Sequence, residues 1–408
     1  MHVVIIGGGA AGCIAAGAAA RDGHTVTVIE RNARPARKVM ITGKGRCNLT
    51  NNCTIEEFIA HVPENGRFLY SALTAFSPAD TMALFEELGV PLKTERGNRV
   101  FPCSDKAVDI VDALTTYARS GGARFVQGRV TALELRDGRC VGVRTEEGQS
   151  IQADAVVIAT GGCSYPGTGS TGDGYTLAQQ AGHTIIPPRP SLVALECSDP
   201  FCPDMQGLSL KNCALQVKDN RTNKVIYSGL GEMLFTHFGM SGPLVLSASA
   251  HMRDMQPGRY TLWINWKPGL TPEQLDARLL RDFAERANLD IGNALGKLLP
   301  RLLIPVMLRM TEINPHKKCN AITKQERLRL AAGIQAMPVQ VSDFRPLAEA
   351  IVTAGGVSIK EVDARTMASR LTKGLYFAGE VLNVDAYTGG FNLQIAFSTG
   401  MAAGSHIE

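Results

Sequence analysis

The chain has 408 residues, of which 45% are hydrophobic and 20% charged, so it is long enough for two or three folded domains and too apolar to be intrinsically disordered. Its formal net charge of +4 is small and identifies no partner by itself. The ten cysteines include no CxxC pair and no cluster with zinc-site spacing, so we expect free thiols, no bound metal and a cytoplasmic location. The sequence also predicts no membrane span.

The first predicted element is a strand–turn–helix–strand unit at the N-terminus. The apolar strand Val3–Ile6 is followed by Gly7, Gly9 and Gly12 in GxGxxG spacing, and a small-residue helix leads to a second strand that ends in Glu30. The first glycine permits a tight turn, the second lets the backbone approach a pyrophosphate, and the third lets helix and strand pack closely. An acid at the end of the second strand accepts hydrogen bonds from ribose hydroxyls and disfavours the 2′-phosphate of NADP. The unit predicts a dinucleotide site.

The next unusual stretch is ITGKGRCNLTN, Ile41–Asn51, which resembles a phosphate-binding P-loop but departs from its pattern at two positions. A P-loop reads GxxxxGK[ST], in which a hydroxyl residue follows the lysine and binds Mg²⁺. Here Gly45 follows Lys44, and Lys38 stands where the first glycine should be. The stretch is therefore not predicted to bind a nucleoside triphosphate.

Further along the chain, apolar periodicity predicts helices at 81–89 and 105–121. Alternating residues with turns at 137–138 and 147–148 predict a three-stranded antiparallel meander over 124–152. Such a meander commonly lies beside the parallel sheet of a dinucleotide-binding domain.

Two later strands decide which dinucleotide is bound. Residues 154–159 form an apolar strand that ends in Thr160 and Gly161, and residues 375–378 form another that runs into Gly379 and Glu380. Flavoproteins of the glutathione-reductase structural class have a strand like the first that returns to the FAD domain. A late strand like the second brings an acid to the ribityl and phosphate region. The two elements in this order favour FAD over NAD.

The residue pattern changes between these two strands. It is typical of β-strands from about residue 192 to residue 266 and of helices after that. We therefore predict an α/β fold with a Rossmann-like FAD-binding domain of the glutathione-reductase class, discontinuous over 1–190 and 333–408. It is interrupted by a β-barrel-like domain at 191–270 and a small, basic helical domain at 271–332.

Basic residues are concentrated in the predicted helical domain. Residues 296–331 contain eight basic side chains and two acidic ones, and this local excess is larger than the net charge of the whole chain. The stretch is either a solvated helical face or a surface for a polyanion such as RNA.

Six motifs in chain order carry a family resemblance: GGGAAG, TGKGRCNLTN, ATGGCSYPGTGSTGDGY, FTHFGMSGP, VTAGGV and FAGEVLNVDAYTGGFNLQIAFSTG. Together they resemble, over nearly the full length, the bacterial flavoproteins of the BaiN/RdsA type, which are NAD(P)/FAD-dependent oxidoreductases. Two activities are attributed to this family: reduction of a steroid enone in bile-acid breakdown, and reduction of uridine to dihydrouridine in 23S ribosomal RNA. The chain looks closer to the ribosomal RNA dihydrouridine synthase members.

The resemblance implies FAD as the cofactor. NADH or NADPH is expected as a transient reductant, because no second GxGxxG unit is present. The segment that begins at Lys38 is expected to run along FAD, with Arg46 and Cys47 near the flavin ring and Val130 near the adenine. The residues expected to bind FAD are Gly7, Gly9, Ala10, Ala11, Gly12, Glu30, Arg31, Lys38, Gly43, Gly45, Val130, Thr160, Gly161, Gly379, Glu380, Asn392 and Leu393.

Both attributed activities are one chemistry, since the C5=C6 bond of uracil is conjugated to its C4 carbonyl. Hydride transfer from flavin N5 must be accompanied by a proton from the protein or water. The candidate donors are Cys47, His237 and Tyr387, and Arg46 would hold the developing enolate oxygen. Each donor also has a purely structural interpretation, and the cations beside Cys47 would favour its thiolate and weaken it as an acid.

Three functions stay open from the sequence: reduction of uridine in ribosomal RNA, reduction of small-molecule enones, and a flavin-bearing ribosome-assembly or RNA-binding factor without turnover. The first and third would use residues 296–331 to contact RNA. A disulfide reductase is excluded, because the pair Cys197 and Cys202 lies 167 residues after Glu30 rather than soon after the ribose acid.

Overall fold

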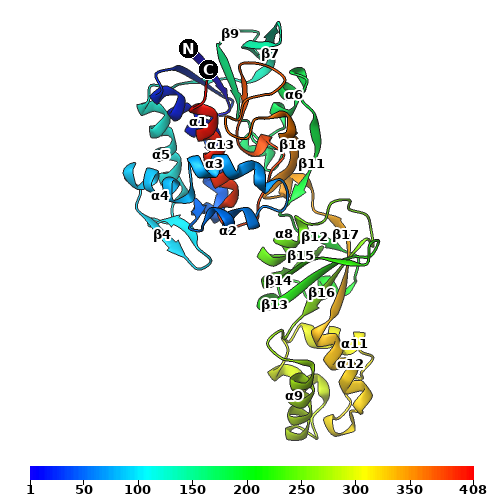
Figure 1. Ribbon diagram of the computed structural model, residues 1–408. Helices are drawn as coiled ribbons and strands as arrows, with labels where there is room; N and C mark the ends of the chain where they lie inside the picture. Colours follow the sequence, from blue (N-terminus) through cyan, green and yellow to red (C-terminus); the bar gives the residue numbers. More distant parts are fainter. The chain divides into compact units, whose positions relative to one another are not determined.

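The computed structural model describes residues 1–408 and divides into two compact units (Figure 1). Unit 1 comprises Met1–Ser191 and Pro346–Glu408, and unit 2 comprises Leu192–Arg345. The chain therefore leaves unit 1 once and returns to it once, as expected of a domain that carries an insertion.

Unit 1 is built on a five-stranded parallel sheet with the strand order β19-β10-β1-β2-β6. The central strand β1 pairs with β2 on one side and with β10 on the other. Both faces of a parallel sheet are normally covered, and the inner strands β1 and β10 accordingly are nearly continuous runs of Val and Ile. The strand bounds are β1 His2–Ile6, β2 Thr25–Glu30, β6 Arg124–Gln127, β10 Ala155–Ile158 and β19 Leu375–Phe377.

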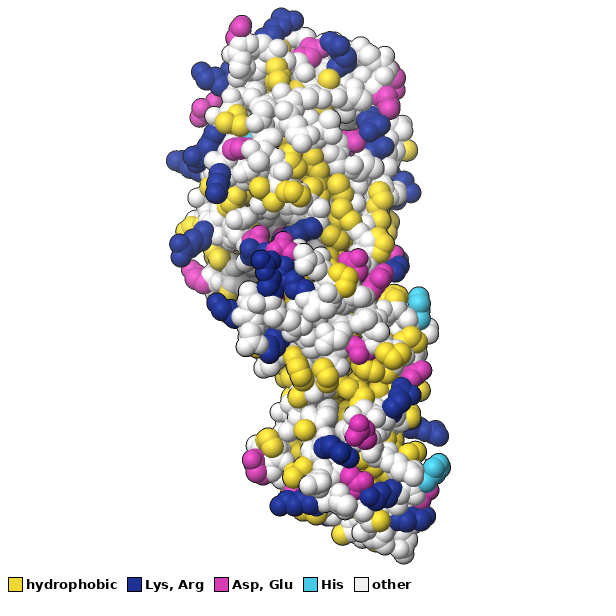
Figure 2. Space-filling model, turned by 90° about the vertical axis from the view of Figure 1, so that its right-hand side faces the viewer, with side chains coloured by type: hydrophobic (Ala, Val, Ile, Leu, Met, Phe, Trp, Pro, Cys, Tyr) yellow, Lys and Arg dark blue, Asp and Glu magenta, His cyan; other side chains and the backbone are white.

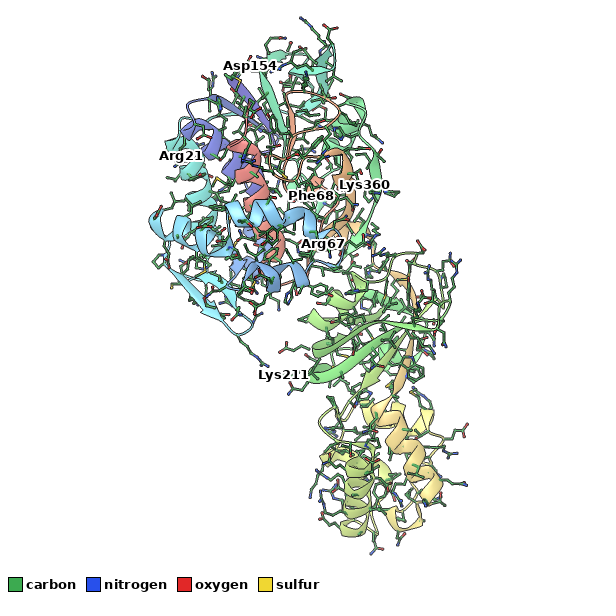
Figure 3. The ribbon with its side chains drawn as sticks, viewed as in Figure 1. Arg21, Arg67, Phe68, Asp154, Lys211 and Lys360 are labelled. Carbon is green, nitrogen blue, oxygen red and sulfur yellow. The ribbon has the colours of Figure 1, made fainter.

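Helix α1 (Ala10–Arg21) owes its position to small residues. A Cβ atom on Gly400 of α13 (Phe391–Gly404) would lie 2.5 Å from the carbonyl oxygen of Ala11, so only glycine allows these two helices to pack this closely. On its other side α1 contacts α5 (Ala107–Ser120), where the guanidinium of Arg21 lies 3.9 Å from the centre of the Tyr117 ring. Figure 3 shows Arg21 beside α5.

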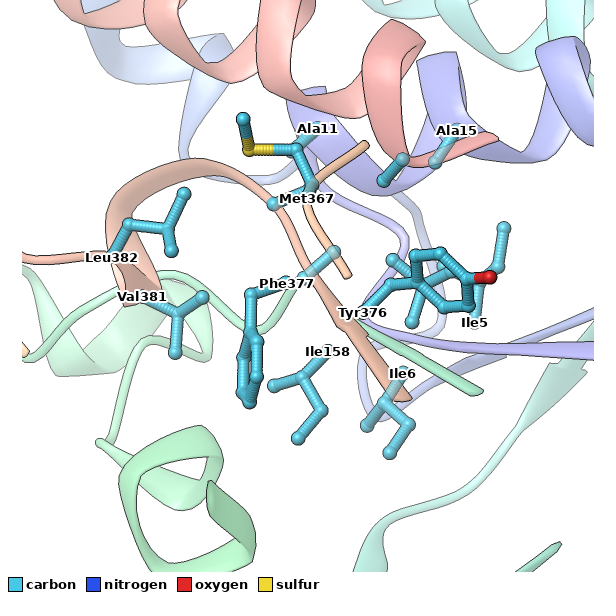
Figure 4. Packing of buried hydrophobic residues seen from close by; sticks show 14 of the residues in the cluster. Ile5, Ile6, Ala11, Ala15, Ile158, Met367, Tyr376, Phe377, Val381 and Leu382 are labelled. Atoms are coloured by element: carbon cyan, nitrogen blue, oxygen red, sulfur yellow. The ribbon is translucent and has the colours of Figure 1, made fainter. Parts of the chain in front are cut away.

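The core of unit 1 joins segments that are far apart in the sequence. Ile5 and Ile6 of β1 pack in one buried cluster with Ile158 of β10 and Tyr376 and Phe377 of β19 (Figure 4). The strand before the N-terminal dinucleotide motif and the strand before the C-terminal motif therefore pack in the same hydrophobic cluster. This packing holds the two motifs at the same edge of the sheet.

The smaller elements of unit 1 include three further sheets: β3-β5-β4, β7-β8-β9 and β11-β18. The sheet β7-β8-β9 is the predicted antiparallel meander, whereas β6, which was predicted with it, pairs with β2 in the parallel sheet. The bounds are α2 Ile55–Ala60, α3 Tyr70–Ala75, α4 Pro78–Glu87, α6 Asp173–Gln180, β3 Thr50–Asn51, β4 Leu92–Glu95, β5 Arg99–Pro102, β7 Val130–Arg136, β8 Arg139–Thr145, β9 Ser150–Gln152, β11 Ile185–Ser191 and β18 Val352–Val357.

Unit 2 contains a closed six-stranded antiparallel barrel with the order β12-β15-β14-β13-β16-β17, and four of its helices lie between β16 and β17 in the sequence. The predicted fold class, a Rossmann-like domain with an inserted barrel and helices, is confirmed. The bounds are β12 Leu195–Cys197, α7 Phe201–Asp204, β13 Ser209–Asp219, β14 Lys224–Phe235, β15 Gly239–Ser241, α8 Pro243–Ser249, β16 Tyr260–Asn265, α9 Pro272–Glu285, α10 Ile291–Ala294, α11 Leu303–Met310, α12 Lys324–Gln335 and β17 Met337–Phe344.

The predicted domain limits differ from the structure at two points. Strand β17 lies in the range 333–408 that the sequence assigned to the FAD-binding domain, yet it pairs with β12 and β16 and closes the barrel. The helices also share one buried cluster with the barrel, in which Leu279 and Leu303 pack with Leu262 and Val339. Barrel and helices form a single unit because neither buries its apolar face alone.

In the folded structure, acidic side chains neutralise most of the basic residues in the stretch 296–331. Five of its eight cations form ion pairs, three of them with acids outside the stretch; the pairs are Arg309–Asp204, Lys317–Glu326, Lys318–Asp290, Arg327–Asp276 and Arg329–Glu312. Figure 2 shows acidic side chains interspersed with the basic ones on this part of the molecule. Lys297, Arg301 and Lys324 are exposed and form no ion pair. No helix of the structure is long and apolar enough to cross a membrane.

Candidate cofactor site

Unit 1 contains a large cavity along the carboxyl edge of its parallel sheet. The cavity and its open mouth together contain about 1350 Å³ of empty space. Its walls come from the residues that follow β1, β2, β6, β10 and β19, together with the start of α13. Ligands of open α/β sheets bind at this edge, and a lining that runs from β6 to β19 suits an extended ligand.

The middle of the cavity is formed by the turn between β1 and α1. A Cβ atom on Gly7, whose φ is +98°, would lie 2.6 Å from the Ala159 carbonyl oxygen, and one on Gly12 would lie 1.9 Å from the Gly7 carbonyl oxygen. A Cβ atom on Gly9 would meet no protein atom within 4 Å. Gly7 and Gly12 are thus required by the fold, whereas Gly9 leaves space for a ligand at the N-terminus of α1, where backbone N–H groups and the helix dipole favour phosphate.

One end of the cavity carries the acid of the N-terminal motif. The Glu30 carboxylate is 8% exposed and accepts hydrogen bonds from the backbone N–H of Gly8 (2.7 Å) and of Asn32 (2.8 Å). Both donors orient the carboxylate and leave further lone pairs for ribose hydroxyls. Beside it, Arg129 donates two hydrogen bonds to Asp173, at 2.8 and 2.9 Å, which lowers the pKa of that carboxyl.

The other end of the cavity carries a second charged group. The Lys38 ammonium donates to Glu380 at 2.8 Å and to the Ser164 hydroxyl at 2.6 Å. Glu380 also accepts from the backbone N–H of Thr353 at 2.9 Å. The strand order puts Glu30, after β2, and Glu380, after β19, on opposite sides of β1.

An orphaned polar atom also points to a ligand in the cavity. Thr160 lines the cavity, and its buried hydroxyl has no hydrogen-bond partner in the protein. Buried hydroxyls are normally satisfied, so this one is suited to a polar group of the ligand. The phosphate-favouring turn, the ribose acid and this hydroxyl together fit an adenine dinucleotide that extends from β6 toward β19.

The family follows from comparison with known proteins. The model of the HI0933-like protein Rossmann domain matches residues 1–406. The chain belongs to this family. Membership implies FAD as the cofactor, in agreement with the cavity.

Two relatives of known activity and one solved structure are similar to this HI0933-like chain over nearly its full length. It is 31% identical to the ribosomal RNA dihydrouridine synthase of Escherichia coli K12, over 98% of this chain and 96% of the relative. It is 32% identical to the 3-dehydro-bile acid delta(4,6)-reductase of Clostridium scindens, over 99% and 98%. In fold it is similar to the 3-ketosteroid-delta4-(5alpha)-dehydrogenase of Rhodococcus jostii RHA1, with a TM-score of 0.53, 17% identity and coverage of 99% and 95%.

Most residues expected to bind FAD line the cavity. They are Gly7, Gly9, Ala10, Ala11, Glu30, Arg31, Lys38, Val130, Thr160, Gly161, Gly379, Glu380, Asn392 and Leu393. Gly12 lies behind the turn, against Gly7. Gly43 and Gly45 do not line the cavity, although Thr42 next to them does.

The stretch around Gly43 braces another loop instead of lining the cavity. Gly43, Lys44 and Gly45 have φ values of +56°, +59° and +83°, so the chain turns away from the cavity after Thr42. A Cβ atom on Gly390 would lie 2.3 Å from the backbone of Thr50, which shows how closely the stretch packs on the loop before α13.

Arg46 does not lie in the cavity as the sequence predicted. Its guanidinium binds Asp105 (Nε to Oδ1, 2.8 Å) and Glu95, and it stacks 4.2 Å from the centre of the Phe101 ring. The hydrogen bonds from Lys93 and Arg46 lower the pKa of Asp105, and the bond from Arg46 lowers that of Glu95. Arg46 therefore fastens the stretch to the β4–β5 hairpin.

Cys47 is fully buried in a hydrophobic cluster and does not line the cavity. Burial raises the pKa of its thiol to about 12. The expectation that neighbouring cations favour the thiolate is wrong, because Arg46 is engaged by two carboxylates and desolvation has the larger effect on Cys47.

The other two candidate donors lie in different units. Tyr387 is half-buried beside the His61 ring, at 5.9 Å between ring centres, and burial raises the pKa of its phenol. Its carbonyl accepts from Asn392, which lines the cavity. His237 is exposed in unit 2, between β14 and β15, with its ring edge-on to Phe238.

Three residues of the cavity were not predicted from the sequence: Asn32, Arg129 and Asp173. Asn32 joins the Glu30 carboxylate to the carbonyl of Thr168, and Asp173 binds Arg129. Asp173 closes the glycine-rich stretch 161–172 at the start of α6, a position that offered a signal. Asn32 and Arg129 offered none, because their roles depend on partners more than 40 residues away.

Thr160→Val is expected to weaken FAD binding about tenfold while leaving the apoprotein at least as stable, because the orphaned hydroxyl costs free energy until a ligand satisfies it. Titration of apoprotein with FAD, followed by flavin fluorescence, measures the affinity. Thr81→Val is the matched control, since the Thr81 hydroxyl is equally buried and unpartnered but does not line the cavity. Equal FAD affinities for the two variants would contradict the assignment.

Proposed function

We propose that this HI0933-like flavoprotein reduces a conjugated C=C bond, and that its substrate is uridine in 23S ribosomal RNA, which becomes dihydrouridine. The observation that carries the proposal is the full-length similarity to a ribosomal RNA dihydrouridine synthase, combined with a cavity that fits FAD. The similarity to a bile acid reductase supports the same bond chemistry, because a steroid dienone and uracil both present a C=C bond conjugated to a carbonyl.

Bound FAD, in its reduced form, supplies the two electrons and one hydrogen of the reduction, with NADH or NADPH as the proposed electron source. The protein contributes the orientation of the cofactor, a dry site and a proton for the carbon next to the carbonyl. We assign that proton to Tyr387, since a phenol is protonated at neutral pH and the Tyr387 carbonyl accepts a hydrogen bond from the cavity residue Asn392. Cys47 is set aside because it is sealed in the core.

RNA contact is proposed for three exposed cations of the stretch 296–331 that form no ion pair: Lys297, Arg301 and Lys324. The affinity of proteins for RNA rests largely on phosphate contacts and falls with salt. A base in folded RNA must be splayed out of its stack before it can meet a flavin, so a separate RNA-binding unit is consistent with this substrate.

The test is mass spectrometry of digested 23S ribosomal RNA from a strain that lacks the protein. We expect one dihydrouridine to disappear, to return with the wild-type gene and with Thr81→Val, and to stay absent with Gly9→Ala, which should not hold FAD. Unchanged dihydrouridine in the deletion strain would contradict the proposal. Return of the modification with a flavin-free variant would show that the protein assists another enzyme.

A further inference from the structure

The ion pair between Lys38 and Glu380 is set into the wall of the cofactor cavity. The two side chains are only 22% and 20% exposed, and the ammonium nitrogen lies 2.8 Å from one carboxylate oxygen and 3.1 Å from the other. Both residues line the cavity, and they are 342 positions apart in the chain. The fold thus places one positive and one negative charge together beside the cofactor.

The hydrogen bonds of Glu380 are used within the protein. One oxygen, Oε1, accepts from Lys38 (3.1 Å), from the Ser164 hydroxyl (3.1 Å) and from the backbone N–H of Thr353 (2.9 Å), while Oε2 accepts from Lys38. A Cβ atom on Gly162 would lie 2.9 Å from Oε1, so the backbone there closes over the carboxylate. This arrangement suits a counter-charge for Lys38 better than the ribityl acceptor that the late strand suggested.

The strand order indicates which part of FAD the pair faces. Glu30 follows β2, the phosphate-favouring turn follows β1, and Glu380 follows β19, two strands beyond β1 on the opposite side from β2. Neighbouring strands lie about 4.8 Å apart, so the pair is about 10 Å from β1 along the edge of the sheet. With the adenosine toward β2, this is the flavin half of the cofactor.

We propose that Lys38 and Glu380 together set the redox potential of the flavin, with the negative charge of Glu380 compensating the positive charge of Lys38. Two-electron reduction of a flavin with uptake of one proton leaves a negative charge on the ring, so a nearby cation favours the reduced form and a nearby anion disfavours it. In a partly buried site such charges act over several ångströms with little screening. The two residues oppose each other, and the potential reflects their balance.

The decisive experiment measures the midpoint potential of the purified holoprotein by reduction alongside a reference dye. Glu380→Gln leaves Lys38 uncompensated and is expected to raise the potential, so that the ratio of reduced to oxidised flavin at a fixed potential rises on the order of tenfold, about 30 mV for a two-electron couple. Lys38→Met leaves the carboxylate uncompensated and is expected to lower the potential by a similar amount. The double variant Lys38→Met/Glu380→Gln should lie near the wild type.

The matched control is Lys93→Met, which removes the same charge from the same unit but breaks a pair with Asp105 that does not line the cavity. Its potential should equal that of the wild type. Shifts of the same sign in the two single variants, or potentials within error of the wild type, would overturn the proposal and leave the pair a structural clamp. A double variant whose potential is displaced from the wild type as far as that of a single variant would also overturn the proposal, because it contains no uncompensated charge.

This inference rests on the FAD site of the proposed function and is independent of its substrate. The potential is measured without RNA or enone, so a negative result here leaves the dihydrouridine assay unaffected. Conversely, loss of the ribosomal RNA proposal would leave the opposite shifts of the two variants in place.

Discussion

Gly9→Ala is expected to yield a folded protein that has lost FAD, whereas Gly12→Ala is expected not to fold. The backbone of Gly9, with φ at −79°, tolerates alanine, and its new methyl group would meet no protein atom within 4 Å. That methyl group instead occupies the space in which a pyrophosphate approaches the N-terminus of α1. We expect the FAD affinity to fall by more than about 100-fold, which corresponds to about 2.8 kcal/mol.

The methyl group of Gly12→Ala has no such room. Its Cβ atom would lie 1.9 Å from the Gly7 carbonyl oxygen, which is backbone at the end of the central strand and cannot move without breaking the turn. Overpacking usually costs about 1–3 kcal/mol, and a clash with fixed backbone is expected to exceed this range. The first motif thus contains one glycine for the ligand and one for the fold.

Three measurements on the purified Gly9→Ala and Gly12→Ala variants check these predictions: flavin absorbance per protein, circular dichroism, and FAD titration of the apoprotein. Gly269→Ala in unit 2 is the control, since it too meets no atom within 4 Å and lies far from the motif in the sequence. Wild-type flavin content in Gly9→Ala would show that the cofactor phosphates bind elsewhere.

Asp385→Asn is expected to stabilise the protein at neutral and alkaline pH. Asp385 is 6% exposed, and burial raises the pKa of its carboxyl to about 6 against the opposing effects of the Ser191 hydroxyl, which donates at 2.6 Å, and of Arg189. The nearby acids Glu64 and Glu380 raise it further. Above this pKa the folded protein carries a buried negative charge.

Proton linkage gives the direction in which the free energy of unfolding changes with pH. Between the ordinary pKa of 3.8 and about 6, the unfolded chain has released this proton while the folded chain keeps it, so the free energy of unfolding falls as pH rises through this window and stays lower above it. Asparagine carries no charge and still offers an acceptor to Ser191. The stability difference between variant and wild type should therefore grow by about 2–3 kcal/mol from pH 3.8 to pH 7.5.

Denaturant unfolding at a series of pH values, followed by the signal of unit 1, measures this difference. Asp112→Asn, which removes a carboxylate that is 65% exposed, should give no comparable dependence on pH. A difference for Asp385→Asn that is constant over the range would mean that the carboxyl titrates normally in the folded protein.

Local patterns were sufficient for the parts of the site that lie within one strand–turn–helix unit. The GxGxxG turn and Glu30 were assigned from spacing, because glycine conformations and the reach of a strand end are fixed within a few residues. The late Gly379-Glu380 strand end was assigned from its resemblance to an element of the glutathione-reductase class. The family resemblance extended this assignment to FAD, and the match of the Rossmann-domain model over residues 1–406 agrees with it.

Charge and proximity in the sequence were misleading where long-range partners decide the outcome. Arg46 and Cys47 were expected at the flavin, but Glu95 and Asp105 hold the first and the hydrophobic core encloses the second. The excess of basic residues in 296–331 left open a cationic surface, but in the structure Asp204, Asp276 and Asp290 from outside the stretch pair with three of these cations.

The sequence by itself determined the dinucleotide motif, the fold class and the family, since these depend on backbone conformation and apolar periodicity that each segment carries. Only the tertiary structure decided that TGKGRCNLTN leaves the cofactor after Thr42 and braces a loop, and that Lys38 and Glu380 meet across 342 residues. The physical reason is that the burial, pairing and charge compensation of a side chain are properties of its neighbours in space, and the neighbours come from remote strands.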